Sequence, residues 1–413
     1  MATIRILIAG HLCNAPRPQK EAAALAAAGH RVTVQGVWSN EVFAQRDRMI
    51  LRNAPFDFVP VADIRQGHPG ALRHRFACRV ASELFRRTRL FTPATLGYAV
   101  RAQLAEARGA QADLTIVHSE GGLWVGTRLL DDGLRVGVDF EDWFSEDLQP
   151  ADRAARPVAR IRKLERELLR RASYRVTTSI ALANALAKDT DTLAPAIVYN
   201  AFPWAERNPS DAASDRRDTS VVSIHWFSQT IGPGRGLEEF FAAMPKILFP
   251  CEVHLRGQLA TAVAKDLLET IPADWRERVH YHPTVDNEEL PGRIAGHDIG
   301  LALETDTIPS RDLTVTNKLL QYLLGGLAIV ASSTQGQREI AARTGRAIHL
   351  LPPGNSEAIA AVINSLLADR ALLDASKRDA LESAQREFCW EKQSTAVVAE
   401  AARALSTLKV EAP

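Results

Sequence analysis

The sequence predicts an α/β protein of two domains. Short apolar runs alternate with helical segments in both halves of the 413 residues, starting at residues 4–9 and again at 220–225. A chain of this length is too long for one compact core. Strand–helix alternation is typical of parallel sheets, which bind ligands at the carboxyl ends of their strands. The polar stretch 206–219 has no apolar period and predicts the linker between the domains.

The composition is that of a globular protein without a general charge preference. Hydrophobic residues make up 46% and charged residues 24%, and the formal net charge of +1 predicts no nucleic-acid partner. Cys13, Cys78, Cys251 and Cys389 are far apart, which favours reduced thiols over disulfides or a metal site. The N-terminus begins directly with a strand, and no apolar run has the length of a membrane span. We therefore expect a cytoplasmic protein.

The first strand–helix–strand unit lacks the signature of a dinucleotide site. The strand over 4–9 ends at Gly10, and the loop continues through His11, Asn14 and Arg17 to a helix over 20–28. A dinucleotide-binding turn requires G-x-G-x-x-G here, which is absent. The sequence therefore disfavours a Rossmann dehydrogenase.

The most informative segment is SRDLTVTNKLLQYLLGGLAIVASS, residues 310–333. It predicts a polar loop, a helix over 317–324 that Thr314 or Thr316 caps and two glycines end, and a buried strand over 327–331. Free amides and the positive end of the helix dipole suit an anion at the start of this helix. Periodicity alone is also compatible with an ordinary helix–strand unit.

A second anion-binding pattern follows the strand at 220–225. The loop FSQTIGPGRG has glycines at positions 232, 234 and 236, and Arg235 stands just before a helix. Glycines permit close backbone approach, and amides, dipole and a fixed positive charge together suit a diphosphate.

These segments resemble the family-4 glycosyltransferases. NKLLQYLLGGLAIVAS is similar to their donor-binding helix, (P/N)K-(L/F)-x-E-Y-x-x-x-G-x-P-V-(I/V)-A-S, and the glycine loop is similar to V-G-R-L-x-x-x-K-G-(L/V)-x-x-L. CEVHLRG at 251–257 and VHYHPTV at 279–285 are similar to the family's (I/L)-x-G-x-G turn and to the edge that holds the base. The resemblance implies an α/β GT-B architecture, in which two Rossmann-like domains face a cleft and a C-terminal helix crosses back to the first domain.

The same resemblance implies domain boundaries and an activity. It places an N-terminal acceptor-side domain at 1–203 with the helix 390–413, and a donor-binding domain at 204–389. The expected reaction moves a hexosyl group from a nucleotide-sugar donor to a hydroxyl acceptor, either lipid-linked or a glycan, as in polysaccharide biosynthesis. Family members retain the anomeric configuration and are expected to need neither metal nor cofactor. The departing phosphate can accept the acceptor's proton.

The resemblance also assigns site residues. His118, Arg235 and Lys318 are the expected catalytic residues. The expected donor contacts are Gly10, Gln229, Gly234, Arg235, Gly257, Pro283, Thr284, Thr314, Thr316, Asn317, Lys318, Gln321 and Glu339.

The sequence departs from the family's motif at three positions. Gln229 stands where the family has a phosphate-binding arginine, so one cation is missing. The family's acidic pair falls at Leu313 and Gln321, with Asp312 one position from the first. Gln321 retains an amide that can hydrogen-bond ribose hydroxyls.

Polar groups also follow strands of the N-terminal half. His118 ends the strand in ADLTIVHS, where the family's D-(V/L)-(I/V)-x-x-H implies a contact with the donor sugar, although a lone histidine is usually structural. Asp139, Glu141 and Asp142 in VDFEDWFSED are similar to the family's acceptor-side D-x-x-D. Acids after a strand can also simply cap the next helix.

Residues 69–89 predict a basic amphipathic helix. Leu72, Phe76, Val80 and Leu84 recur every fourth residue, and six arginines surround them. The general rule favours a stripe that packs on its own domain below a solvated basic face, and peripheral contact with the inner face of a membrane is the alternative. The second interpretation suits a lipid-linked acceptor.

Two other classes of function stay open. A nucleotide-sugar epimerase shares the GT-B architecture and would isomerise the donor without any acceptor. A non-catalytic binding or partner subunit is motivated by Gln229, Gln321 and the missing first glutamate. Such a subunit would bind a nucleotide without turning over a donor.

Overall fold

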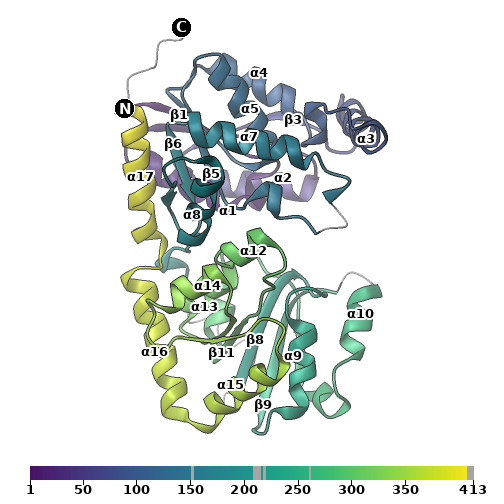
Figure 1. The fold of residues 1–413 in the computed structure, drawn as a ribbon, viewed down its shortest axis with the longest axis vertical. Helices are drawn as coiled ribbons and strands as arrows, with labels where there is room; N and C mark the ends of the chain where they lie inside the picture. The colour runs from purple at the N-terminus through teal and green to yellow at the C-terminus, as the bar shows by residue number, and fades with distance from the viewer. Residues whose placement is uncertain (150–152, 208–214, 217–219, 260–261, 407–413) are drawn as a thin grey trace. The chain divides into compact units, whose positions relative to one another are not determined.

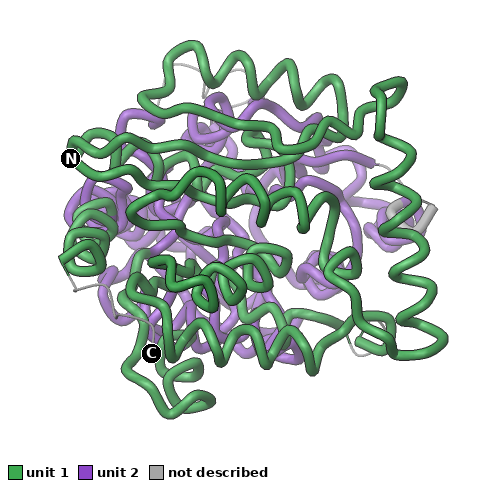
Figure 2. Tube along the Cα trace, turned by 90° about the horizontal axis from the view of Figure 1, so that it is seen from above, with its two compact units in different colours: residues 1–178, 182–198, 394–413 green, residues 179–181, 199–393 purple. Residues whose placement is uncertain are grey.

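The structure, a computed structural model, describes residues 1–149, 153–207, 215–216, 220–259 and 262–406. It divides into two compact units, each built around a parallel sheet (Figure 1, Figure 2). Unit 1 consists of residues 1–178, 182–198 and 394–413, and unit 2 of residues 179–181 and 199–393. Of the predicted linker, 208–214 and 217–219 lie outside the described residues.

Unit 1 has a seven-stranded sheet in the order β3-β2-β1-β4-β5-β6-β7. The strands are β1 (Thr3–Leu7), β2 (Arg31–Trp38), β3 (Asp57–Asp63), β4 (Leu114–Val117), β5 (Val136–Phe140), β6 (Tyr174–Thr177) and β7 (Ala196–Ile197). The helices are α1 (Pro16–Ala27), α2 (Glu41–Leu51), α3 (Ala71–Thr88), α4 (Val100–Ala110), α5 (Ser119–Asp131), α7 (Val158–Arg171) and α8 (Ile180–Thr190), of which the first two residues of α8 belong to unit 2.

The central strands of unit 1 explain why the sequence shows continuous apolar runs. Every residue of β4 and β5 is buried, as expected for parallel strands covered on both faces. Helix α5 packs on β4, β5 and α7 (Figure 1). Gly137 permits close packing with β6, because a Cβ there would lie 2.8 Å from the Cβ of Tyr174.

Unit 2 has a six-stranded sheet in the order β10-β9-β8-β11-β12-β13. The strands are β8 (Val222–Thr230), β9 (Cys251–Gln258), β10 (Val279–His282), β11 (Ile299–Ala302), β12 (Ala328–Ser332) and β13 (Ile348–Leu351). The helices are α9 (Leu237–Ala243), α10 (Ala262–Glu269), α11 (Leu290–Ala295), α12 (Pro309–Leu313), α13 (Asn317–Gly325), α14 (Gln335–Ala341), α15 (Ser356–Ala368) and α16 (Arg370–Arg386).

One face of the unit 2 sheet carries its main hydrophobic core. Ile224 and Trp226 of β8 and Val253 and Leu255 of β9 are buried there with residues of α9 and α15. Because side chains alternate along a strand, the residues between them face the opposite side of the sheet. That opposite side carries His225 of β8 and His254 of β9.

The last helix, α17 (Trp390–Ser406), connects the two units through the chain. Its first amide, from Trp390, donates to the carbonyl of Phe202 in unit 2 at 2.9 Å. Residues from Ser394 onward belong to unit 1, where Glu400 accepts a hydrogen bond from the amide of Arg175 at 3.2 Å. The C-terminal helix thus returns to the N-terminal unit, as predicted. The chain passes from unit 1 to unit 2 after Val198 and returns to unit 1 at Ser394. The sequence places these two boundaries at 203/204 and 389/390.

Helix α3 packs on unit 1 through a different face from the predicted apolar stripe. Its buried residues are Ala71, Ala81 and Phe85. Leu72 and Phe76 are 84% and 70% exposed, so the expectation that the stripe packs on its own domain is wrong for this part of the helix. Periodicity identifies an apolar stripe, but not which face the rest of the protein covers. No helix among the described residues combines the length and hydropathy of a membrane span.

Candidate functional site

The predicted donor residues of unit 2 collect where its strands end. β10, β9, β8 and β11 are neighbours, so the loops after them share one edge of the sheet. The glycine loop follows β8, Pro283 follows β10, and Glu304 lies just beyond β11. The start of α13 is connected to the same edge, because Lys318 of α13 pairs with Glu304.

Lys318 and Glu304 form a buried ion pair at the N-terminus of α13. Lys318 Nζ lies 2.9 Å from Glu304 Oε1, and the two side chains are only 5% and 8% exposed. Burial opposes ionisation of Glu304, but the charge and hydrogen bond of Lys318, together with Arg235, hold its pKa below the usual range. Lys318 also lies 5.6 Å from the ring centre of Trp226. Glu304 is therefore a carboxylate that faces both cations of the predicted phosphate site.

The expected side-chain cap of α13 is not formed. Thr316 occupies the N-cap position without a side-chain hydrogen bond to the helix, because its hydroxyl donates to Glu304 Oε1 at 3.2 Å. Thr314 packs through its backbone against Gly336 of α14. The contact is so close that a Cβ on Gly336 would lie 2.3 Å from the carbonyl oxygen of Thr314. Neither threonine side chain thus caps the first amides of α13, which are the groups that bind anions at helix starts.

The glycine loop needs glycine for steric reasons. Gly236 has φ 81°, and a Cβ on it would lie 2.2 Å from the Cβ of Leu303 at the end of β11. Gly234 has φ 78°, and its amide donates to Glu238 at 2.6 Å. Arg235 lies between these two glycines with an exposed side chain. The loop backbone therefore passes directly over β11 and presents Arg235 outward.

Gln321 lies one helical turn after Lys318 and has an unused acceptor. The residue is 5% exposed, and its Oε1 is buried without a hydrogen-bond partner among the described residues. Gly257, at the end of β9, could not carry a side chain, because a Cβ would lie 2.8 Å from the carbonyl of Ser228. A buried acceptor without a donor costs free energy, so the Oε1 of Gln321 is a candidate for a hydrogen bond with a ligand.

Other predicted donor contacts are exposed or already bonded within their unit. Gln229 and Thr284 are exposed. The carbonyls of Gly10 and Pro283 accept hydrogen bonds from Val37 and Arg256, and Asn317 accepts one from Asn200. Glu339 accepts the amides of Ile180 and Ala181 at 3.0 and 2.9 Å. Asp312, one position from the missing glutamate, accepts bonds from the amide and side chain of Gln335 and so caps α14.

In unit 1, His118 is held on both sides by carboxyl groups. Its Nδ1 lies 2.9 Å from Glu141 and its Nε2 lies 2.8 Å from Glu21, which also accepts a hydrogen bond from the hydroxyl of Tyr174. The side chain of His118 is 4% exposed. Burial lowers the pKa of His118, but the two carboxylates outweigh it and raise the pKa to about 10. His118 is therefore an imidazolium whose two nitrogens already have partners.

Arg17 and Asp139 complete this buried cluster. The guanidinium donates to both oxygens of Asp139, at 2.6 and 3.1 Å, and to the carbonyl of Val198 at 2.8 Å. Burial raises the pKa of Asp139 to about 6 despite Arg17 and His118. Among the predicted acceptor-side acids, Asp139 is thus internal, whereas the side chain of Glu141 is 32% exposed. Asp142 is half-buried.

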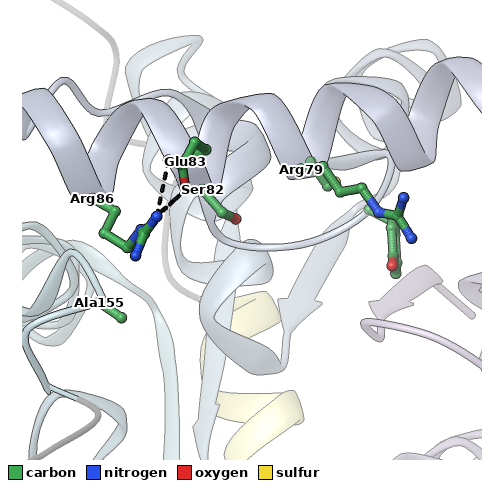
Figure 3. A pocket seen from close by; sticks show the side chains of 7 residues that line it. Arg79, Ser82, Glu83, Arg86 and Ala155 are labelled. Atoms are coloured by element: carbon green, nitrogen blue, oxygen red, sulfur yellow. Dashed lines mark hydrogen bonds and ion pairs between the residues drawn. The ribbon is translucent and has the colours of Figure 1, made fainter.

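A hollow of about 510 Å³ lies beside α3 (Figure 3). Its lining residues are Cys78, Arg79, Ser82, Glu83, Arg86, Tyr98 and Ala155. Arg86 is paired with Glu83 on the same helix, while Arg79 is exposed. The hollow therefore places two guanidinium groups next to the exposed apolar stripe.

Sequence reasoning missed two residues that organise these sites. Glu304 lies just after β11, so a search for polar residues that follow a strand, as His118 follows β4, also identifies Glu304. Glu21 lies within α1, and no sequence signal connects it with His118, because their contact depends on how α1 lies on the sheet.

Two Rossmann-like parallel sheets and a returning C-terminal helix define the GT-B fold of glycosyltransferases. Within unit 2, residues 224–369 match the family model described as Glycosyl transferases group 1. The matched segment contains Arg235, Glu304, Lys318 and Gln321.

Solved structures of this fold resemble nearly the whole chain. HepE (Alr3699) from Anabaena, in complex with UDP-glucose, has a TM-score of 0.69 at 16% identity over 97% of this chain and 100% of that chain. Sucrose-phosphate synthase from Thermosynechococcus elongatus has a TM-score of 0.71 at 16% identity over 96% and 97%. A Listeria monocytogenes protein described as a UDP-N-acetylglucosamine 2-epimerase has a TM-score of 0.57 at 12% identity over 100% and 98%. Comparison with curated protein sequences finds no match. At these identities the likeness shows the fold.

Proposed function

We propose that the protein transfers a sugar from a nucleotide-sugar donor to a hydroxyl acceptor, and that unit 2 binds the donor. The observation that carries the proposal is the buried Lys318–Glu304 pair at the start of α13, beside Trp226, whose indole N–H donates to the carbonyl of Arg235 in the glycine loop at 3.4 Å. A diphosphate is stabilised by backbone amides, a helix dipole and fixed cations, which are the groups present here. The family match over residues 224–369 supports the same assignment.

Each part of a nucleoside diphosphate has a candidate partner in unit 2. Arg235 and Lys318 bind the phosphates, and the unpartnered Oε1 of Gln321 accepts a hydrogen bond from a ribose hydroxyl. Glu304 offsets the charge of Lys318, so Arg235 supplies the net positive charge of the site. The backbone around Gly257 and Pro283 forms the edge for the base.

The proposed reaction retains the configuration of a transferred hexose. The bond between the anomeric carbon and the phosphate oxygen breaks, and a bond to the acceptor oxygen forms on the same face. The departing phosphate oxygen takes the proton of the acceptor hydroxyl, so no catalytic carboxylate is required. Arg235 and Lys318 stabilise the charge that develops on the leaving diphosphate, without a metal ion in that role.

A nucleotide screen followed by a turnover assay tests the proposal. UDP, GDP, ADP and dTDP are compared by thermal unfolding, where a ligand at a hundred times its dissociation constant adds about 2.7 kcal/mol of stability. UDP-glucose, with which HepE was solved, is the first donor to test for release of UDP. Absence of stabilisation by all four nucleotides contradicts the proposal.

The same assay separates the two alternatives. The structural likeness to the protein described as an epimerase favours a second candidate, donor isomerisation. An isomerised nucleotide sugar formed without an acceptor identifies an epimerase. Tight nucleotide binding without release or isomerisation of the sugar identifies a non-catalytic subunit.

We further propose that the protein works at the inner, anionic face of a membrane and takes a lipid-linked acceptor. Leu72 and Phe76 are exposed on α3, and Val80 is 46% exposed on the same stripe. Arg73 and Arg79 are exposed among them, and the hollow beside the helix adds Arg86 (Figure 3). Apolar side chains surrounded by arginine favour the boundary between headgroups and acyl chains.

Co-sedimentation with vesicles tests the membrane contact. Wild type is expected to pellet with phosphatidylserine-containing vesicles at low salt, less at high salt, and not with neutral vesicles, because each cation near an anionic surface contributes about 1 kcal/mol. Leu72→Ser with Phe76→Ser should abolish pelleting. Leu193→Ser is the matched control, since Leu193 is 79% exposed elsewhere in unit 1. Pelleting that the α3 variant retains contradicts the assignment.

A further inference from the structure

A row of histidines crosses three neighbouring strands of unit 2. His225 of β8 pairs in register with His254 of β9, which pairs in register with His280 of β10. Glu252 precedes His254 by two residues on β9, so its side chain points to the same face of the sheet. This is the face opposite the main hydrophobic core.

Three of these side chains converge on one point. Glu252 Oε2 lies 3.4 Å from His254 Nε2 and 3.7 Å from His280 Nε2, and all three atoms lie within 4.8 Å of one another. Each atom is buried without a hydrogen-bond partner among the described residues. The side chain of His254 is 1% exposed. A buried polar group without a partner marks a missing proton, water or ion.

We propose that Glu252, His254 and His280 bind one divalent transition-metal ion, and that Zn²⁺ is the ion that fits best. Zinc takes imidazole nitrogen and carboxylate oxygen at about 2.0–2.1 Å in tetrahedral geometry, which puts neighbouring ligand atoms about 3.3–3.4 Å apart. The observed separations of 3.4 and 3.7 Å are close to this spacing before any ion is bound. Three protein ligands leave the fourth position to water.

The second ring nitrogen of His254 is positioned as in metal sites. Its Nδ1 lies 3.0 Å from Nε2 of His282, whose own Nδ1 lies 3.7 Å from Asp215. Metal-binding histidines commonly hold their other nitrogen in such a chain, which fixes the ring and its tautomer.

The surrounding charges permit a cation. The two nearby arginines are paired, Arg256 with Asp215 and Arg216 with Asp298. The side chains of Glu252 and His280 are 18% and 21% exposed, so these two ligands lie closer to the surface than His254.

A similar group in unit 1 does not qualify. Glu21, His118 and Asp139 also lie within 4.8 Å of one another. Their atoms are already engaged by Arg17, Tyr174, Glu141 and each other. Of the two groups found among the described residues, the one in unit 2 combines close spacing with unpartnered atoms.

The ion would link the edge strand β10 to its neighbour β9. β10 is the edge strand and has only four residues, and the ion would connect it to β9 through side chains as well as the ladder. The carbonyl of Pro283, just after β10, belongs to the proposed base-binding edge. Metal binding would therefore stabilise unit 2 without taking part in the transfer reaction.

Equilibrium dialysis of the full chain against Zn²⁺, followed by elemental analysis, tests the proposal. We expect one zinc per chain, a rise in Tm on adding Zn²⁺ and its reversal by EDTA. Glu252→Gln and His280→Ala should each weaken binding by about a hundredfold or more, because each removes one of three ligands. Cobalt in place of zinc should give the strong visible absorption of a tetrahedral site.

Controls keep the result independent of folding. Glu277→Gln removes an exposed carboxylate just before β10 and should bind zinc as wild type does. Circular dichroism checks that the two ligand variants, both altered at partly exposed positions, remain folded. Absence of bound zinc, or equal binding by Glu252→Gln, His280→Ala and wild type, overturns the site.

Discussion

The two units share one plan, but their predicted site residues differ in burial and in hydrogen bonding. In unit 1, Arg17 and His118 are buried: Arg17 donates to both oxygens of Asp139, and His118 lies between the carboxyl groups of Glu21 and Glu141. In unit 2, Arg235 is exposed and Gln321 has an unused acceptor. The difference teaches that the segments after parallel strands can place a cation either inside its unit, as His118 after β4, or at the surface, as Arg235 after β8.

The largest effect that this comparison predicts is on the stability of unit 1. His118→Ala leaves Glu21 and Glu141 without their shared partner, and breaking a buried ion pair from one side costs about 3–5 kcal/mol. Urea unfolding of the variant measures the loss. His68→Ala is the control, because the side chain of His68 is 45% exposed and such changes usually stay within about 0.5 kcal/mol.

The opposite result would support the sugar-contact hypothesis. If His118→Ala keeps its stability and loses donor turnover while UDP affinity is unchanged, His118 contacts the transferred sugar. In that case, the pairing with Glu21 and Glu141 is only a resting arrangement.

The second prediction concerns pH. The pKa of folded His118 is about 10, above its ordinary value of 6.5, so its pairing stabilises the fold fully below pH 6.5 and less as the pH rises through about 10. Stability of wild type should therefore fall from pH 7 towards pH 10. His118→Gln should show a shallower fall, because the titrating ring is gone. Parallel stability–pH curves for the two proteins would show that His118 is not the group responsible.

The third prediction sharpens the assignment of Gln321. If its Oε1 accepts a hydrogen bond from ribose, wild type should bind UDP about fivefold more tightly than 2′,3′-dideoxy-UDP, since one such bond contributes about 1 kcal/mol and tenfold is 1.4 kcal/mol. Gln321→Met, of similar volume, should bind the two ligands with nearly equal affinity. Isothermal titration gives both constants. A preference that survives the substitution assigns the ribose contact to another residue.

The sequence predicted the fold better than it predicted the sites. Alternating apolar runs indicated two parallel sheets, and the helix at 317–324 is observed as Asn317–Gly325, ended by Gly326 in the left-handed conformation. These features depend on local chemistry and periodicity. Which partners a polar side chain finds depends on tertiary contacts, so the bonding of Thr316 to Glu304 instead of its own helix was not predictable.

The same limit applies to α3 and to the histidines. Periodicity identifies the apolar stripe of α3, but the residues of this helix that are buried are Ala71, Ala81 and Phe85. Glu252, His254 and His280 come from two strands without a metal-binding spacing, and only the register of β9 with β10 brings them together.

An effect of similar size to that of Gln321 is predicted at Glu304. Glu304→Gln removes the carboxylate that offsets Lys318, so UDP should bind several-fold more tightly, by about 1 kcal/mol. Glu382→Gln, at an exposed position of α16, should leave the affinity unchanged. Weaker binding of UDP would show that Glu304 is needed chiefly to position Lys318.

The most direct test of the proposed donor site is a titration of UDP, or of the nucleotide that stabilises the protein best, into wild type, Arg235→Ala and Arg378→Ala. Arg378 is an exposed arginine on α16 of the same unit and serves as the matched control. Removing a charge-assisted phosphate contact costs about 1.5–3 kcal/mol, so Arg235→Ala should bind roughly ten- to a hundredfold more weakly, whereas Arg378→Ala should match wild type. Equal dissociation constants for all three proteins would contradict the assignment of unit 2 as the nucleotide-binding unit through Arg235.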